Sequence, residues 1–186
     1  MNAEDLGSRA IQYRRLAPDE LELVRLIDRS ERIDALYTQR GTRLVLRSSD
    51  VSAPAWSAEG TGAHSVVGQI AAVRAYVHRG AIALGAFDGD RLVGIGVVLP
   101  HLRPGIAQCA YLHVSDGYRG RGIGGRLCAE LEEIARDAGD ATMVVSATPS
   151  RNTVRFYGLR GFTPMAEPLP ELVALEPEDV HLSKPL

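Results

Sequence analysis

Apolar and polar residues recur along this chain with two periods, which mark the expected helices and strands. Helical spacing predicts one helix that begins at Pro18 and a second that ends at Tyr37, with a break near residues 28–30. Further helices are expected at residues 66–80, 123–138 and 150–159. Alternating or continuous apolar stretches predict strands at residues 11–16, 42–47, 81–87, 91–99, 106–115, 141–148, 162–166 and 179–183. This order predicts an α/β chain with a mixed, α+β type of sheet.

The connections between these elements carry fewer signals. Residues 1–10 form a polar lead-in, and a loop rich in Pro and Glu joins the last two strands. Residues 48–62 are rich in Ser, Ala, Gly and Pro, which predicts a loop. Trp56 in this loop is expected either to anchor it in the core or to lie as an aromatic lid over a substrate. The length of 186 residues predicts a single domain over residues 1–186.

Composition excludes several classes of protein. The chain is 45% hydrophobic and 24% charged, as in globular proteins, and its 21 basic and 23 acidic side chains give a net charge of −2. This balance argues against nucleic acid or an anionic membrane as the main partner. Cys109 and Cys128 lie in apolar stretches and are expected to be reduced core thiols. No signal peptide or membrane-spanning stretch is recognisable, so we expect a cytoplasmic protein.

The strongest chemical signal is a glycine-rich turn between the strand at 106–115 and the helix at 123–138. Glycines at 120, 122, 124 and 125 let the backbone approach a ligand closely, and the following helix offers free N–H groups. Arg119, Arg121 and Arg126 add positive charge. The turn therefore predicts a phosphate or pyrophosphate site. The alternative is a plain strand-to-helix connection with solvated arginines.

Two common phosphate-binding motifs fit this turn poorly. Gly120-x-Gly122-x-x-Gly125 formally satisfies the dinucleotide fingerprint, but the strand at 141–148 ends in Ser, Ala and Thr, without the acidic residue that binds a ribose. A P-loop needs a lysine after the glycines, and Lys184 is the only lysine of the chain. A nucleotide-binding oxidoreductase stays as an alternative that NAD binding would support. The histidines show no metal-ligand spacing, so no metal site is expected.

The turn and a second block resemble the GCN5-related N-acetyltransferase (GNAT) superfamily. Arg119-x-x-Gly122-x-Gly124, preceded by Leu112-x-Val114, matches the first motif of that family. Asn152, Phe156-Tyr157 and Gly161-Phe162 resemble the second block. The resemblance covers residues 80–165, and residues 11–47 fit it in outline. It implies a GNAT-like acyl-CoA N-acyltransferase fold, in which a mostly antiparallel sheet flanked by helices splays at the cofactor strand.

The same resemblance implies roles for individual residues. Acetyl-CoA would be the cosubstrate, and the strand Leu112-His113-Val114 would bind its pantetheine arm and polarise the thioester. Asn152 would contact the cofactor or fix its helix, and Tyr157 would be the general acid that protonates the leaving thiolate. Gly122 and Gly124 would lie where no Cβ fits. The pyrophosphate would lie on the backbone of Arg119, Gly120, Arg121, Gly122, Ile123, Gly124 and Gly125.

The function expected from the resemblance is transfer of an acetyl group to a primary amine, by direct attack in a ternary complex. Glu31, in the expected acidic helix pair, and His113 are candidates for the base that deprotonates the amine. The alternatives are a solvated carboxylate and a packed neutral imidazole. Acidic residues near residues 19–34 and 167–179 would suit a cationic small-molecule or peptide amine. A non-catalytic acyl-CoA-binding regulatory domain is the alternative function, and a homodimer is possible because family members often dimerise.

Overall fold

The computed structural model describes residues 10–186, and within them the backbone forms a large and a small sheet. The expected lead-in at residues 1–10 lies, apart from Ala10, outside the described residues. The large sheet has the strand order β1-β4-β5-β6-β7-β9-β8, and β2 pairs only with β3. The strands are β1 (Gln12–Arg15), β2 (Glu31–Arg40), β3 (Arg43–Ala53), β4 (Ile82–Asp88), β5 (Arg91–Arg103), β6 (Ile106–Val114), β7 (Thr142–Ala147), β8 (Thr163–Pro164) and β9 (Val180–Pro185). The helices are the 3-10 helix η1 (Pro18–Leu26) and the α-helices α1 (Val66–His78), α2 (Ile123–Asp137), α3 (Arg151–Gly158) and α4 (Pro170–Leu175).

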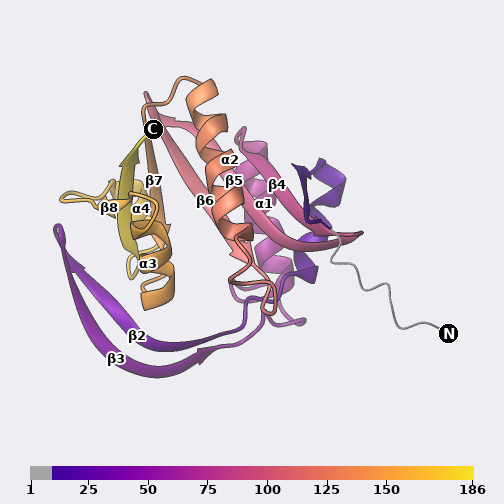
Figure 1. Cartoon of the computed structure of the whole chain (residues 1–186), viewed down its shortest axis with the longest axis horizontal. Coiled ribbons are helices and arrows are strands. Elements are labelled where there is room, and N and C mark those ends of the chain that lie inside the picture. The colour runs from indigo at the N-terminus through magenta and orange to yellow at the C-terminus, as the bar shows by residue number, and fades with distance from the viewer. Residues whose placement is uncertain (1–9) are drawn as a thin grey trace.

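Neighbouring strands of the large sheet are antiparallel in the described chain, except for the parallel pair β6 and β7. The mixed, mostly antiparallel sheet expected from the sequence is therefore confirmed. Helices cover both of its faces, with α2 and α1 on opposite sides (Figure 1). One apolar core joins α2 and α3 to the sheet, and a second joins α1 and η1 to the other face.

The parallel strands β6 and β7 separate partway along their length. Among the described residues their pairing ends at Gln108 and Val144, although β6 continues to Val114 and β7 to Ala147. Ala110 lies in a bulge, because Cys109 pairs with Val98 and Tyr111 with the preceding residue Val97. A bulge bends its strand, so it accounts for the divergence of β6 from β7. The splayed sheet is thus confirmed, and Figure 1 shows the two strands diverging.

The prediction of a second early helix is wrong, because residues 31–40 form the strand β2. Ile33 and Ala35 are buried while their neighbours are exposed or half-buried, which is strand alternation. Gly41, with φ of +56°, and Thr42 connect β2 to β3 in a two-residue turn that is typical of hairpins. Apolar residues at 33, 36 and 37 also fit helical spacing, so the pattern alone did not separate the two possibilities. The hairpin forms a long curved arm (Figure 1).

Two expected loops contain regular structure. β3 continues to Ala53, so residues 48–53 belong to the hairpin, and the loop before β9 contains α4. The other expected helices and strands are present within a few residues. The Ser150 hydroxyl accepts a hydrogen bond from the Thr153 amide and caps the start of α3. No helix among residues 10–186 is long and apolar enough to cross a membrane.

Helix α2 lies close to β5 because two glycines of that strand leave room for it. A Cβ on Gly96 would lie 3.0 Å from Leu131 Cδ1, and one on Gly94 would lie 3.0 Å from Ile123 Cγ2. We therefore expect Gly96→Val to lower the free energy of unfolding by about 1–3 kcal/mol, because the larger side chain overpacks this contact. Urea unfolding measures the change.

Gly62→Val is the matched control, because a Cβ on Gly62 meets no atom within 4 Å. Its free energy of unfolding should change by less than about 0.5 kcal/mol. Equal stability of the two variants would contradict the close packing of α2 on β5.

Candidate active site

The gap between β6 and β7 narrows to an apex at Gln108 and Val144, and Tyr157 lies next to this apex. Its hydroxyl is 3.8 Å from the sulfur of Cys109, the first residue of β6 beyond the pairing with β7. The α3 helix carries Tyr157, whose ring packs edge-on against Phe156 and Phe162 and whose side chain is buried. The gap thus has a protonated oxygen donor at its closed end.

Burial determines the protonation state of these groups. Desolvation raises the pKa of Tyr157 well above its ordinary value, so the hydroxyl keeps its proton throughout the neutral range. Desolvation also raises the pKa of Cys109 to about 12 and that of Cys128 above its ordinary value. Both thiols are therefore protonated at neutral pH and are poor nucleophiles.

The glycine-rich turn presents free amides at the start of α2. Gly122 is the N-cap residue with a left-handed backbone, φ +80°, and Gly120 has φ of +76°. The Arg126 amide donates to the Gly122 carbonyl, which is the first bond of the helix. The amides of Ile123, Gly124 and Gly125 precede it and have no acceptor within the helix. They can hold an anion with the favourable end of the helix dipole.

The two glycines of the motif are required for different reasons. A Cβ on Gly124 would lie 3.2 Å from the Phe156 ring, which leaves little room, as expected. A Cβ on Gly122 would meet no atom within 4 Å, so the expectation of a steric conflict there is wrong. Its left-handed backbone is what favours glycine at this position.

The three arginines of the turn differ in their contacts, and therefore in how available their charge is to a ligand. Arg119 donates from Nε to the Val114 carbonyl at 3.1 Å and from Nη1 to the Ser30 carbonyl at 2.7 Å. Arg126 pairs with Glu130 at 2.6 Å, which neutralises much of its charge. Arg121 lies over the Tyr118 ring at 5.0 Å and forms no salt bridge within residues 10–186, so its charge is the one most available to a phosphate.

A clamp, which was not predicted from the sequence, joins the end of β6 to residues 28–30. The buried Ser115 accepts a hydrogen bond from the Asp28 amide at 3.0 Å, and the Asp116 amide donates to the Asp28 carbonyl at 2.8 Å. Together with the bond from Arg119 to Ser30, these contacts fix the turn relative to the start of β2. Ser115 directly follows the Leu112-x-Val114 motif, but a single serine carries no signal for such a partner 87 residues away.

His113 lies on the face of β6 opposite to Leu112 and Val114. Its ring packs against Trp56 and Tyr111, with centroid distances of 5.2 Å and 4.6 Å. Burial, with the Arg29 and Arg119 charges, lowers the pKa of His113 to about 4, so the ring is neutral at pH 7. Trp56 is 8% exposed, as expected for a loop anchor rather than a lid. Leu112 and Val114 are half-buried and pack against the α2 core.

Glu31 and Asn152 are brought together, although Glu31 starts a strand and not the expected helix. Asn152 Nδ2 donates to Glu31 Oε1 at 3.0 Å, which joins β2 to the first turn of α3. The Tyr37 amide donates to the Pro149 carbonyl at 2.8 Å and reinforces the same junction. Glu31 therefore has a hydrogen-bonding partner in the described structure, and its role as a base stays a prediction.

Three of the six acidic residues between positions 19 and 34 are paired with arginines. Within the described residues, Glu20 pairs with Arg14, Glu22 with Arg25 and Arg74, Asp34 with Arg151, and Glu171 with Arg103. An acidic lining for a cationic substrate is thus weak on the side of residues 19–34.

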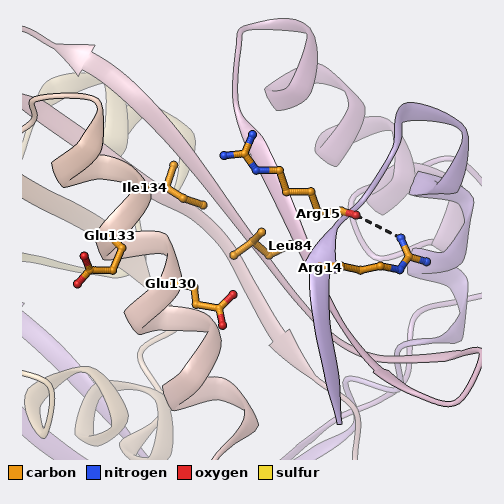
Figure 2. Close-up of a pocket in the computed structure, with 6 residues that line it drawn as sticks. All are labelled: Arg14, Arg15, Leu84, Glu130, Glu133 and Ile134. Atoms are coloured by element: carbon orange, nitrogen blue, oxygen red, sulfur yellow. Dashed lines mark hydrogen bonds between the residues drawn. The ribbon is translucent and has the colours of Figure 1, made fainter.

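A shallow groove of about 340 Å³ lies elsewhere, between β1 and α2. Figure 2 shows Glu130 and Glu133 projecting from α2, with Arg14 and Arg15 on β1. The groove contains none of the residues expected to bind acetyl-CoA or the acceptor. The residues that the structure describes also contain no group of three His, Cys, Asp or Glu side chains that could hold a metal ion.

A sheet split between parallel strands, with a glycine-rich helix start beside the split, defines the class of acyl-CoA N-acyltransferases. The chain belongs to the GNAT acetyltransferase family, whose model matches residues 49–162. It is accordingly an acetyl-CoA-dependent N-acetyltransferase, with acetyl-CoA as cosubstrate.

Solved structures share this fold over nearly the whole chain. A nourseothricin acetyltransferase aligns with a TM-score of 0.69 and 18% identity over 95% of this chain and 98% of that chain. A Bacillus anthracis str. Ames protein assigned as a streptothricin acetyltransferase, solved with acetyl-coenzyme A, has a TM-score of 0.66 and 18% identity over 97% and 98%. The PaiA N-acetyltransferase of Thermoplasma acidophilum, solved with coenzyme A, has a TM-score of 0.61 and 17% identity over 95% and 99%. The comparison with curated protein sequences found no match to this chain.

The free amides of the turn lead to a prediction for Gly120, where a Cβ meets no atom within 4 Å. Gly120→Asp should weaken acetyl-CoA binding about tenfold or more, because the carboxylate repels the pyrophosphate. Gly120→Asn is the matched control. Its side chain has nearly the same size as that of Gly120→Asp and must adopt the same left-handed backbone, but it carries no charge. Calorimetric titration measures both affinities. Equal affinities for the two variants would place the pyrophosphate elsewhere.

The low pKa of His113 predicts a pH-dependent stability. Between about pH 4 and the ordinary histidine pKa of 6.5, the unfolded chain binds a proton that the folded chain does not. The contribution of His113 to the free energy of unfolding therefore rises with pH across this window and is constant above it. His113→Phe keeps an aromatic ring and should lose less stability between pH 7 and pH 5 than the wild type in urea unfolding.

His64→Phe replaces an exposed histidine and should keep the wild-type pH dependence. If His113→Phe also keeps it, the imidazole of His113 is not desolvated.

Proposed function

We propose that this protein transfers the acetyl group of acetyl-CoA to a primary amine of a small molecule or peptide, by direct attack in a ternary complex. The observation that carries the proposal is the gap between β6 and β7, with the Tyr157 hydroxyl at its closed end. A thioester in this gap would lie beside a proton donor, while both faces of the split sheet offer a route to the carbonyl carbon.

The cosubstrate would lie along the free edge of β6. This edge, at residues 112–114, faces the gap and has no partner in β7 among the described residues. Its N–H and C=O groups can pair with the amides of a pantetheine arm, as in an added strand. The same backbone can donate to the thioester oxygen as negative charge develops there. The amides at the start of α2 would hold the pyrophosphate.

The reaction needs two proton movements. An alkyl amine has a pKa of roughly 10.4, so it must lose a proton before it attacks. The nitrogen lone pair forms the C–N bond, and the C–S bond then breaks with its electrons on sulfur. Tyr157 gives the thiolate its proton and regains one that the amine nitrogen released. Its raised pKa keeps the donor protonated until the thiolate forms.

Direct attack is favoured over an acyl-enzyme. The candidate thiols, Cys109 and Cys128, are buried, and burial raises the pKa of each. Neither has an activating histidine within hydrogen-bond distance in the described structure. A two-step mechanism, in which a cysteine first takes the acetyl group and then passes it to the amine, therefore has no support.

Calorimetric titration with acetyl-CoA, with NAD as the matched control, tests the cosubstrate. Release of free thiol in the presence of a panel of primary amines then tests transfer. Nourseothricin and a streptothricin belong in this panel, because two full-length structural neighbours carry those substrates in their names. Binding of acetyl-CoA without thiol release from any amine would favour the non-catalytic acyl-CoA-binding alternative. Homodimer formation stays a prediction from the family resemblance.

The proposed acid predicts the behaviour of Tyr157→Phe. The variant fills the same volume and loses only the hydroxyl, so it should fold normally. We expect kcat to fall about a hundredfold or more, because the thiolate leaves without a positioned proton, while both KM values change less than threefold. Steady-state thiol release measures these constants.

Tyr13→Phe on β1 is the matched control and should keep both constants, because Tyr13 packs beside Arg126 and outside the gap. A kcat of Tyr157→Phe within twofold of wild type would remove Tyr157 from the mechanism.

A further inference from the structure

An unpartnered histidine lies beside the gap, on β9. His181 is 4% exposed, and its Nδ1 is 3.0 Å from the Ser146 hydroxyl on β7. The other ring nitrogen, Nε2, is buried and has no hydrogen-bonding partner within the described structure. A buried polar atom without a partner is uncommon and indicates a position that a ligand can fill.

Strand register places His181 near the point where β6 and β7 part. Ser146 pairs with His181 across β7 and β9. Continuing the pairing of Gln108 with Val144 would put Ser146 opposite Ala110, the bulge residue, so His181 lies one strand away from the open gap. Val145 and Leu182 pack in the same core as Tyr157. Because side chains alternate along strands, Ser146 and His181 face the other side of the sheet, the side on which α1 packs against β5.

Asp179 lies on the same side, immediately before β9. The Asp179 amide donates to the Glu176 carbonyl at 3.2 Å, which ties Asp179 to the residue that follows α4. The Tyr76 hydroxyl is 3.5 Å from Gln108 Nε2 at the apex of the gap. Asp179 and Glu176 form no salt bridge within residues 10–186, whereas Glu171 of α4 is paired with Arg103. Arg79, the residue that caps the end of α1, lies over the Tyr76 ring at 5.7 Å and adds a positive charge there.

We propose that Asp179 and His181 form the subsite for the ammonium group of the acceptor, on the face of the gap opposite to Tyr157. The inference rests on the proposed function and names its substrate class, a primary ammonium. An ammonium has three N–H donors. The Asp179 carboxylate and the lone pair of His181 Nε2 accept two of them, and Ser146 holds the proton of the ring on Nδ1.

The subsite also supplies the first proton transfer. The ammonium N–H bond breaks, its proton moves to an Asp179 oxygen, and the electron pair stays on nitrogen as the nucleophile. Protonated Asp179 later releases this proton to solvent. Burial and the Glu176 charge raise the pKa of Asp179 to about 7, which makes it a stronger base than an ordinary carboxylate. The ammonium thereby loses its first proton to Asp179 on one face of the sheet, and the thiolate gains one from Tyr157 on the other.

Asp179→Asn tests the subsite, with Glu178→Gln as the matched control, since Glu178 is an exposed acid one position away. We expect Asp179→Asn to raise the KM for the amine about tenfold or more, with the KM for acetyl-CoA unchanged. In the wild type and Glu178→Gln, kcat/KM for the amine should fall as pH drops below about 7, where Asp179 takes up a proton. Asp179→Asn should lose this decline. Identical KM values and pH profiles for the two variants would overturn the proposal.

A binding measurement on the wild-type protein does not depend on turnover. In ¹⁵N NMR, His181 should show the tautomer protonated on Nδ1, and butylamine should shift the Nε2 resonance. A proton on Nε2, or no shift at saturating butylamine, would overturn the subsite. Such a shift without acetylation of any amine would refute the proposed function and leave the subsite standing. Acetylation of an amine without the shift would support the proposed function and refute the subsite.

Discussion

The loss of pairing between β6 and β7 after Gln108 is the constraint on which the rest of the site depends. Two parallel strands that continue side by side without hydrogen bonds expose backbone groups that need partners. The bulge at Ala110 bends β6 away from β7, and helices α2 and α3 pack together on one face of the split sheet. The space is therefore built into the sheet, and its free strand edge is suited to an extended ligand arm.

The two faces of this split sheet offer different chemistry. On the side of α2 and α3, Tyr157 and the two cysteines lie in an apolar core, where burial keeps each of them protonated. On the side of α1, polar groups collect around Tyr76, Ser146 and His181. An acid on one face and proton acceptors on the other suit a reaction in which the attacking amine loses a proton and the leaving sulfur gains one.

The hairpin arm and the glycine turn are held as one unit. Ser115 and Arg119 bind the backbone of residues 28–30, so the end of β6 that leads into the glycine turn is fixed to the start of β2. Farther along β2, Gln39 accepts from the His181 amide at 2.7 Å and donates to the Met165 carbonyl at 2.9 Å. The segment from residue 28 to residue 40 thus contacts both the glycine-turn end of β6 and His181 on β9, which couples their relative positions.

The sequence by itself determined the mixed sheet, the helices α1, α2 and α3, and the glycine turn, because these depend on local periodicity, caps and backbone freedom. It also determined the family, through Arg119-x-x-Gly122-x-Gly124 and the block around Tyr157. It did not determine the secondary structure of residues 31–40. Their apolar positions fit both a helix and a strand, and pairing with β3 decided for the strand. The clamp at Ser115, the neutral state of His113 and the unpartnered Nε2 of His181 were decided only by tertiary structure. Each depends on burial or on a partner distant in sequence, and neither property is encoded in local spacing.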